Sequence, residues 1–183
     1  MGGPLRCKYC INPQSWNTQP PYQYTPKELF DIVSVDSIYF SSTKGGLTFG
    51  GGEPLLHSLF IEEFRKLCPK TWNFWVETSL NVPYENISRV LSVFDIFVVD
   101  IKSTDLQVYK EYTTQSGLRV IDNIKKLLVD IGPEHIIVRV PIIPDIADEA
   151  SQIESIAQLT EIGITQFDRF EYVVPSWFEN PTC

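Results

Sequence analysis

Short apolar runs alternate along this chain with longer segments in which apolar residues recur with helical spacing. The short runs are rich in β-branched and aromatic residues, which is typical of strands. The predicted strands cover residues 46–49, 72–77, 95–101, 136–143 and 169–174. The predicted helices cover residues 26–35, 59–67, 84–93, 117–131 and 147–162. Apolar strands that alternate with helices predict an α/β fold in which helices cover a parallel sheet.

The chain is predicted to form a single domain over residues 1–183, a length that suits one domain. Residues 1–24 are rich in Pro, Asn, Gln and Tyr and have no sustained period, so we expect an ordered loop there. Thr25 followed by Pro26 predicts the start of the first helix. No internal repeat, low-complexity tract or linker interrupts residues 25–183, which we therefore expect to form the core.

Periodicity alone leaves two arrangements of the sheet open, a doubly wound sheet and a partial barrel. In both arrangements, ligands bind at the carboxyl ends of the strands. Polar residues follow the predicted strands at residues 50–53, 77–81, 100, 102, 139 and 171. Part of this clustering is automatic, because polarity resumes wherever a buried strand ends.

Charge and composition exclude several classes of partner. The chain is 43% hydrophobic and carries a formal net charge of −8, without a basic stripe that could bind nucleic acid. No apolar run approaches the roughly 18 to 20 residues that span a bilayer, and the start lacks the pattern of a secretory signal. We therefore expect a cytoplasmic protein that binds neither nucleic acid nor membrane.

Cys7 and Cys10 form a C-x₂-C pair, which predicts metal, cluster or redox chemistry before it predicts a disulfide. The pair would suit half of a zinc site, but the sequence has no second such pair, and His57 and His135 lie far apart. A C-x₃-C-x₂-C loop would supply three thiolates to a [4Fe–4S] cluster and leave one iron open. Gly3 stands at the position of the first cysteine of such a loop.

A glycine turn, Gly50-Gly51-Gly52-Glu53-Pro54, directly follows a predicted strand. Glycines let the backbone approach a ligand closely, and a carboxylate can accept hydrogen bonds from an ammonium group. The alternative is a tight turn in which Glu53 begins a helix and is favoured by the helix dipole.

Two further strands carry charged residues. Asp100 and Lys102 lie two positions apart, so both side chains are expected on one face of the sheet. They could contact a ligand, or they could form a solvated ion pair worth roughly 0–1 kcal/mol. Arg139 lies inside an apolar strand, and we expect it to have an anionic partner because an unpaired buried charge is costly.

The loop Cys7-Lys8-Tyr9-Cys10-Ile11-Asn12-Pro13, together with the downstream glycine turn, resembles the radical S-adenosylmethionine (SAM) enzymes. The similarity is strongest to the activating enzymes of the pyruvate formate-lyase type. It implies that the glycine turn and Glu53 hold the amino group of SAM, and that Glu77 and Thr78 bind a monovalent cation. The implied cluster ligands are Cys7 and Cys10, the implied cofactor-binding residues are Tyr9, Gly51, Gly52, Glu53, Thr78, Asp100, Lys102 and Arg139, and the implied catalytic residues are Lys102 and Arg139.

The resemblance also implies a fold and an activity. The expected fold is a partial (β/α)₆ barrel of parallel strands that lacks its first strand. The expected cofactors are a [4Fe–4S] cluster and SAM, whose reductive cleavage gives a 5′-deoxyadenosyl radical that takes hydrogen from a glycine of a partner enzyme. The expected partners are that glycyl-radical enzyme and an electron donor of the flavodoxin or ferredoxin type.

This chain departs from the family pattern at Gly3, at the strand expected before the loop, and at residues 173–177, where a histidine that contacts adenine is not evident. We interpret the chain as truncated rather than degenerate, and we expect its activity to be impaired. Three alternatives remain: a cluster-free SAM-fold binding module, a radical SAM enzyme with another substrate, and a doubly wound domain that binds zinc.

Overall fold

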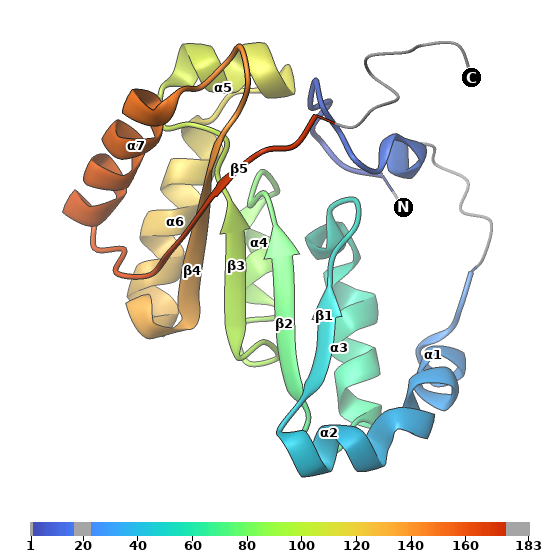
Figure 1. The fold of residues 1–183 in the computed structure, drawn as a ribbon. Helices are drawn as coiled ribbons and strands as arrows, with labels where there is room; N and C mark the ends of the chain where they lie inside the picture. Colours follow the sequence, from blue (N-terminus) through green and yellow to red (C-terminus); the bar gives the residue numbers. More distant parts are fainter. Residues whose placement is uncertain (1, 17–22, 175–183) are drawn as a thin grey trace.

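The fold is built on one parallel sheet, which the computed structural model describes within residues 2–16 and 23–174 (Figure 1). Its five strands pair in the order in which they occur in the chain, and every pairing is parallel. They are β1 (Gly46–Phe49), β2 (Asn73–Thr78), β3 (Ile96–Asp100), β4 (Ile136–Ile142) and β5 (Phe167–Glu171). A doubly wound sheet reverses its strand order at one point, so the sequential order identifies a partial α/β barrel.

Helices connect successive strands and cover one face of the sheet. They are α1 (Pro26–Val33), α2 (Ser37–Thr43), α3 (Ser58–Leu67), α4 (Tyr84–Ser88), α5 (Leu106–Thr113), α6 (Leu118–Ile131) and α7 (Glu149–Glu161). The predicted start of α1 is confirmed, because the Thr25 hydroxyl accepts from the N–H of Glu28 and the Glu28 carboxylate accepts from the N–H of Thr25. This reciprocal capping box satisfies two N–H groups that the helix would otherwise leave unpaired.

The five predicted strands are confirmed, while two short helices were not predicted. Helix α2 consists largely of β-branched, aromatic and Ser residues, which have weak helix propensity, and tertiary packing overrides that propensity. Helix α5 begins at the N-cap Asp105, whose carboxylate accepts from two N–H groups. Helix α4 ends at Ser88 rather than at residue 93 because the chain continues in turns.

Strand β5 begins at Phe167, two residues before its predicted start, and ends at Glu171. Its register is set by pairing with β4, in which Val138 lies opposite Phe167 and Arg139 lies opposite Asp168. β5 is mostly exposed, so the apolar pattern that marked the other strands is weak in this one.

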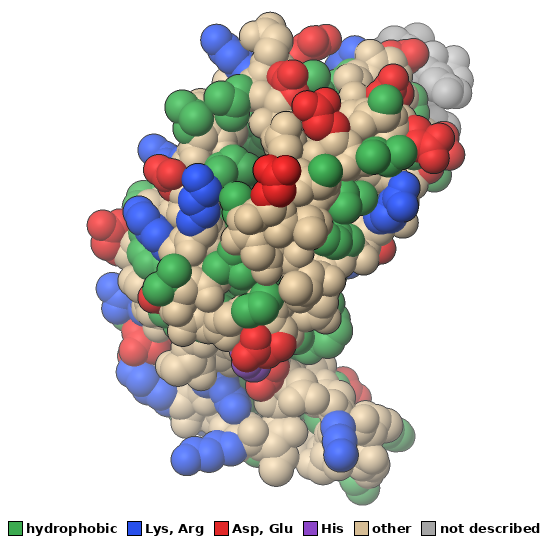
Figure 2. Space-filling view, turned by 90° about the vertical axis from the view of Figure 1, so that its left-hand side faces the viewer, with side chains coloured by type: hydrophobic (Ala, Val, Ile, Leu, Met, Phe, Trp, Pro, Cys, Tyr) green, Lys and Arg blue, Asp and Glu red, His purple; other side chains and the backbone are tan. Residues whose placement is uncertain are grey.

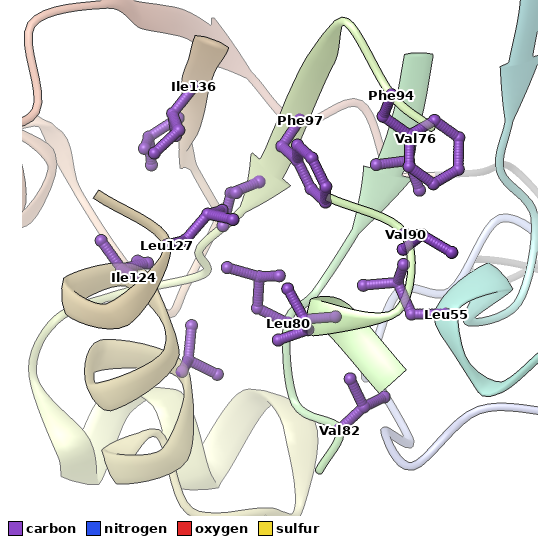
Figure 3. Packing of buried hydrophobic residues seen from close by; sticks show 14 of the residues in the cluster. Leu55, Val76, Leu80, Val82, Val90, Phe94, Phe97, Ile124, Leu127 and Ile136 are labelled. Atoms are coloured by element: carbon purple, nitrogen blue, oxygen red, sulfur yellow. The ribbon is translucent and has the colours of Figure 1, made fainter. Parts of the chain in front are cut away.

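The hydrophobic core lies between the sheet and the helices. Side chains alternate along a strand, so Phe74 and Val76 of β2 face the helices while Trp75 and Glu77 face the other side. In Figure 3, Val76 of β2 lies beside Phe94, and Phe97 of β3 lies between these residues and Leu127 of α6. The inner, concave face of the partial barrel is therefore free to carry polar residues.

The described parts of the chain contain no helix that is long and apolar enough to cross a bilayer. On the face shown in Figure 2, acidic and basic side chains are interspersed rather than gathered by sign. The outline of the molecule is indented on the right-hand side of that view.

The close approach of β1 to β2 predicts a strict requirement for glycine at position 46. A Cβ added at Gly46 would lie 1.7 Å from the carbonyl oxygen of Asn73, so Gly46→Ala must displace the backbone of the neighbouring strand. We expect a loss of about 3 kcal/mol in the free energy of unfolding, at the upper end of overpacking. Urea denaturation measures it, with Gly3→Ala as the control, because a Cβ at Gly3 meets only ordinary contacts and should cost less than about 0.5 kcal/mol. Equal losses in the two variants would contradict this account.

Candidate functional site

A cavity of about 470 Å³ opens at the carboxyl ends of the strands, beneath the loop that carries the two cysteines. This is the edge at which the sequence analysis expected polar residues to gather. The cavity brings together the residues for which that analysis predicted cluster, cofactor or cation binding, and they are Cys7, Tyr9, Cys10, Gly51, Gly52, Glu53, Glu77, Thr78, Asp100, Lys102 and Arg139. Their individual roles stay predictions.

The cysteine loop is fixed to the barrel by hydrogen bonds from its backbone. The N–H groups of Arg6 and Lys8 donate to the carbonyl oxygens of Thr113 and Tyr112, at 3.0 and 2.9 Å. These two carbonyls belong to the end of α5, which the sequence analysis missed. The guanidinium of Arg6 also donates to the carbonyl oxygen of Gly3 at 2.8 Å. These hydrogen bonds therefore hold the cysteine loop against the end of α5.

Tyr9 of this loop packs against two other tyrosines, Tyr112 and Tyr172. The ring of Tyr9 packs edge-on against Tyr112 and is stacked with Tyr172, with ring centroids 6.2 and 6.3 Å apart. The hydroxyl of Tyr172 donates to the backbone carbonyl of Tyr9. Burial raises the pKa of the Cys7 thiol to about 11, an effect that the nearby Lys102 ammonium partly opposes. Both cysteines are free thiols and partly buried.

The residues present fit a [4Fe–4S] cluster only in part. Cys7 and Cys10 supply two thiolates, and in the described ranges no group of three or more His, Cys, Asp or Glu residues is placed to hold a metal ion. A Cβ added at Gly3 would lie 3.6 Å from the N atom and 3.7 Å from the Cβ of Glu53, in ordinary contact distance. Position 3 therefore lies on the cavity wall and has room for a side chain, but glycine supplies no ligand there.

Glu53 is a buried carboxylate, 3% exposed, that joins the glycine turn to the end of β2. Its Oε1 accepts from the hydroxyl of Thr78 at 2.7 Å and from the N–H of Leu55 at 3.2 Å. Its Oε2 accepts from the N–H and the hydroxyl of Ser79 at 3.0 and 2.7 Å. The N–H of Glu53 in turn donates to the carbonyl of Gly2 at 3.1 Å. Glu53 thus begins the helical turn Pro54–His57, as the alternative interpretation expected, and it also lines the cavity, while its role in binding an ammonium group stays a prediction.

A belt of five charged side chains crosses the inner face of the sheet. Arg139 on β4 forms ion pairs with Glu77 of β2 at 3.0 Å and with Asp168 of β5 at 3.1 Å. Lys102, just beyond β3, lies 3.7 Å from Asp100. The predicted anionic partner of Arg139 is confirmed and is in fact two carboxylates. All five residues line the cavity.

The sequence analysis did not single out Asp168, Phe170, Tyr112 or Tyr172, which also line the cavity. Asp168, Phe170 and Tyr172 lie two positions apart in sequence, and Asp168 and Phe170 pair with Arg139 and Pro141 of β4. The spacing of two could have indicated that the three side chains share one face of a strand. The strand was hard to recognise, however, because β5 is mostly exposed and lacks the apolar pattern of the other strands. Residues 175–177, within the segment searched for an adenine-contacting histidine, lie outside the described residues.

Comparison with known proteins bears on this site. A family model described as the Radical SAM superfamily matches residues 2–158. The chain is 34% identical over 140 residues to the (2S)-3-sulfopropanediol dehydratase activating enzyme of Klebsiella oxytoca, covering 75% of this chain and 44% of the relative. It is 32% identical over 159 residues to the pyruvate formate-lyase-activating enzyme of Clostridium pasteurianum, covering 87% of this chain and 66% of the relative. The chain thus spans less than two thirds of the length of these relatives.

A solved structure of SuiB from Streptococcus suis bound to S-adenosylmethionine is similar in fold. Its TM-score is 0.71 at 16% sequence identity, and the match covers 94% of this chain and 39% of that chain. At this identity the likeness bears on the fold alone, and it agrees with the partial barrel described above.

The burial of Glu53 predicts how stability changes with pH. Burial raises the pKa of its carboxyl above the ordinary value of 4.5, although hydrogen bonds from Ser79 and Thr78 oppose the rise. The folded state therefore holds this proton more tightly than the unfolded state does, and the resulting stabilisation is present below about pH 4.5 and is lost as the pH rises through the folded-state pKa. The stability advantage of the natural chain over Glu53→Gln should shrink as the pH rises above about 4.5 through the folded-state pKa.

Urea denaturation at several pH values within this range measures that difference. Glu161→Gln is the control, because it makes the same chemical change at an exposed position at the end of α7. A difference between the natural chain and Glu53→Gln that grows with pH would contradict the account.

Proposed function

Because the chain belongs to the radical SAM superfamily, we propose that it is an activating enzyme that cleaves SAM reductively and forms a glycyl radical on a partner enzyme. The observation that carries the proposal is the convergence of the two cysteines, the glycine turn and the charged belt on one cavity. Support for the activating chemistry comes from the relatives, which are named as the activating enzymes of (2S)-3-sulfopropanediol dehydratase and of pyruvate formate-lyase and which match most of this chain.

The charges of the cavity suit SAM. The belt combines three carboxylates, Glu77, Asp100 and Asp168, with two cations, Lys102 and Arg139, so its formal charge is 2 − 3 = −1. SAM carries a sulfonium, an ammonium and a carboxylate, and its net charge is the opposite. Lys102 and Arg139 can donate hydrogen bonds to its carboxylate, while backbone carbonyls of the glycine turn can accept hydrogen bonds from its ammonium.

Cys7 and Cys10 would hold the cluster, and a third ligand is needed from outside the described donor set. A cluster bound there would supply one electron to the sulfonium of SAM. The protein itself places the thiolates, packs Tyr9 of the loop against Tyr112 and Tyr172, and shields the cavity with these rings. These contributions are binding, orientation and exclusion of water.

Three further features belong to the same proposal. A monovalent cation would bind near Glu77 and Thr78 once the pair between Glu77 and Arg139 opens, because that pair neutralises the carboxylate in this structure. The protein substrate would be a glycyl-radical enzyme, and the electron donor would be of the flavodoxin or ferredoxin type. The site of action would be the cytoplasm.

Gly3 favours a second candidate, a binding module that retains the SAM cavity without a cluster. The same cavity and charges would bind SAM in both cases, and only the number of thiolates differs. One experiment on position 3 therefore separates the two candidates.

The experiment is anaerobic reconstitution with iron and sulfide of the natural chain, Gly3→Cys and the control Gly3→Ala. We expect Gly3→Cys to retain about four iron ions per chain, because its Cβ fits beside Glu53 and its thiol completes the three-thiolate loop. Its reduced EPR spectrum should change when SAM is added. Gly3→Ala adds the Cβ without the thiol and should retain far less iron.

Each outcome decides between the candidates. A SAM-sensitive cluster in the natural chain would support the activating enzyme for the chain as it stands. SAM binding by calorimetry without a cluster in the natural chain, but with one in Gly3→Cys, would favour the binding module for this chain. If Gly3→Cys retains no more iron than Gly3→Ala, the cluster role of the loop is wrong.

A further inference from the structure

Arg139 is held from two sides by carboxylates on different strands. Its Nε donates to Oδ2 of Asp168 at 3.1 Å, and its Nη1 lies 3.0 Å from Oε1 of Glu77. Asp168 is the direct neighbour of Arg139 in the register of β4 and β5. Glu77 belongs to β2, which is separated from β4 by β3, so the guanidinium reaches across β3 to meet it.

The two contacts use different edges of the guanidinium. A guanidinium is planar and presents its donors in a fixed fork, so a carboxylate on Nε fixes the orientation of the whole plane. Asp168 engages Nε, and Glu77 takes one donor of the outer edge formed by Nη1 and Nη2. Within residues 2–16 and 23–174, Nη2 has no hydrogen-bond partner. At the wall of the cavity, the outer edge of Arg139 thus has one nitrogen paired with Glu77 and one without a protein partner in these ranges.

We propose that Asp168 is a positioning residue, which keeps the outer edge of Arg139 in place for the carboxylate of the ligand. Glu77 is then the counter-ion that the ligand carboxylate replaces. This inference rests on the proposed function, because SAM supplies the carboxylate. It adds a residue of β5 that touches neither cluster nor ligand and acts through Arg139.

The geometry distinguishes the two carboxylates. Asp168 is adjacent to Arg139 and accepts from Nε. A ligand carboxylate that binds the outer edge, Nη1 and Nη2, does not need Nε. Glu77 bonds to the edge that a ligand carboxylate would need for a bidentate contact, the stronger of the two geometries. Its side chain is 38% exposed, so water can solvate the carboxylate once it is released. Lys102 lies 3.7 Å from Asp100 and offsets the repulsion that Asp100 would exert on an incoming carboxylate.

The test compares the binding of two ligands by isothermal titration calorimetry. SAM carries the carboxylate, and its decarboxylated form lacks it and is one charge more positive. The measured quantity is the preference for SAM, taken as the ratio of the two dissociation constants, in the natural chain and in Asp168→Asn. We expect the preference for SAM to be roughly 10- to 100-fold smaller in the variant than in the natural chain. This is the effect of misplacing one charge-assisted hydrogen bond.

A change in net charge alone predicts the opposite result. Asp168→Asn removes a negative charge from the cavity. By charge alone, this loss weakens the binding of decarboxylated SAM more than the binding of SAM, so the preference for SAM would rise. The direction of the change therefore separates positioning from simple electrostatics. Asp168→Glu should restore part of the preference, and Asp122→Asn is the matched control on an exposed position of α6. The thermal midpoint of each variant without ligand reports whether the fold is intact.

The outcomes separate this inference from the proposed function. Loss of the preference in Asp168→Asn, at an unchanged thermal midpoint, supports the positioning role. An unchanged or increased preference overturns that role and leaves the SAM site standing. Equal affinity of the natural chain for both ligands overturns the role of Arg139 as the carboxylate receptor. If the natural chain binds neither ligand, before or after reconstitution, the SAM site itself fails and the inference fails with it.

Discussion

Glu53, a residue with a buried carboxylate, connects three segments whose relative position defines the cavity. It accepts hydrogen bonds from the end of β2 through Thr78 and Ser79, and its own backbone N–H donates to Gly2 at the start of the chain. A buried carboxylate is costly unless its oxygens are satisfied, and here four donors satisfy them. If this carboxylate were removed, the glycine turn would lose its hydrogen bonds to the end of β2, while the backbone bond to Gly2 would remain.

The inner face of the sheet is arranged on a different principle. Its charges are near the mouth of the cavity and only partly buried, so the desolvation penalty is moderate. Arg139 is flanked along β4 by Val138 and Val140, which are buried on the opposite face against the helices. The strand period of two therefore lets one strand stabilise the core on one face and place a cation at the cavity wall on the other. The stability of the fold depends on one face, and its chemistry depends on the other.

The sequence predicted the sheet well because each central strand is an apolar run bounded by turns, as in the strand from Ile96 to Asp100. It predicted the cavity residues because parallel strands end at a common edge. It missed α5 because that helix is short and has a weak amphipathic pattern, so its role in holding the cysteine loop was invisible. It missed Asp168 because the residue lies on an exposed edge strand, where a charged side chain carries no signal of function.

The position of the site and the chemistry of the site have separate origins in this chain. Backbone hydrogen bonds to α5, the hydroxyl of Tyr172 and the contact between Gly2 and Glu53 place the cysteine loop over the cavity without any metal ligand. The number of thiolates, by contrast, depends on the single residue at position 3. The shape of the cavity can therefore be kept while the number of thiolates changes with one side chain, because the two are determined by contacts that do not overlap.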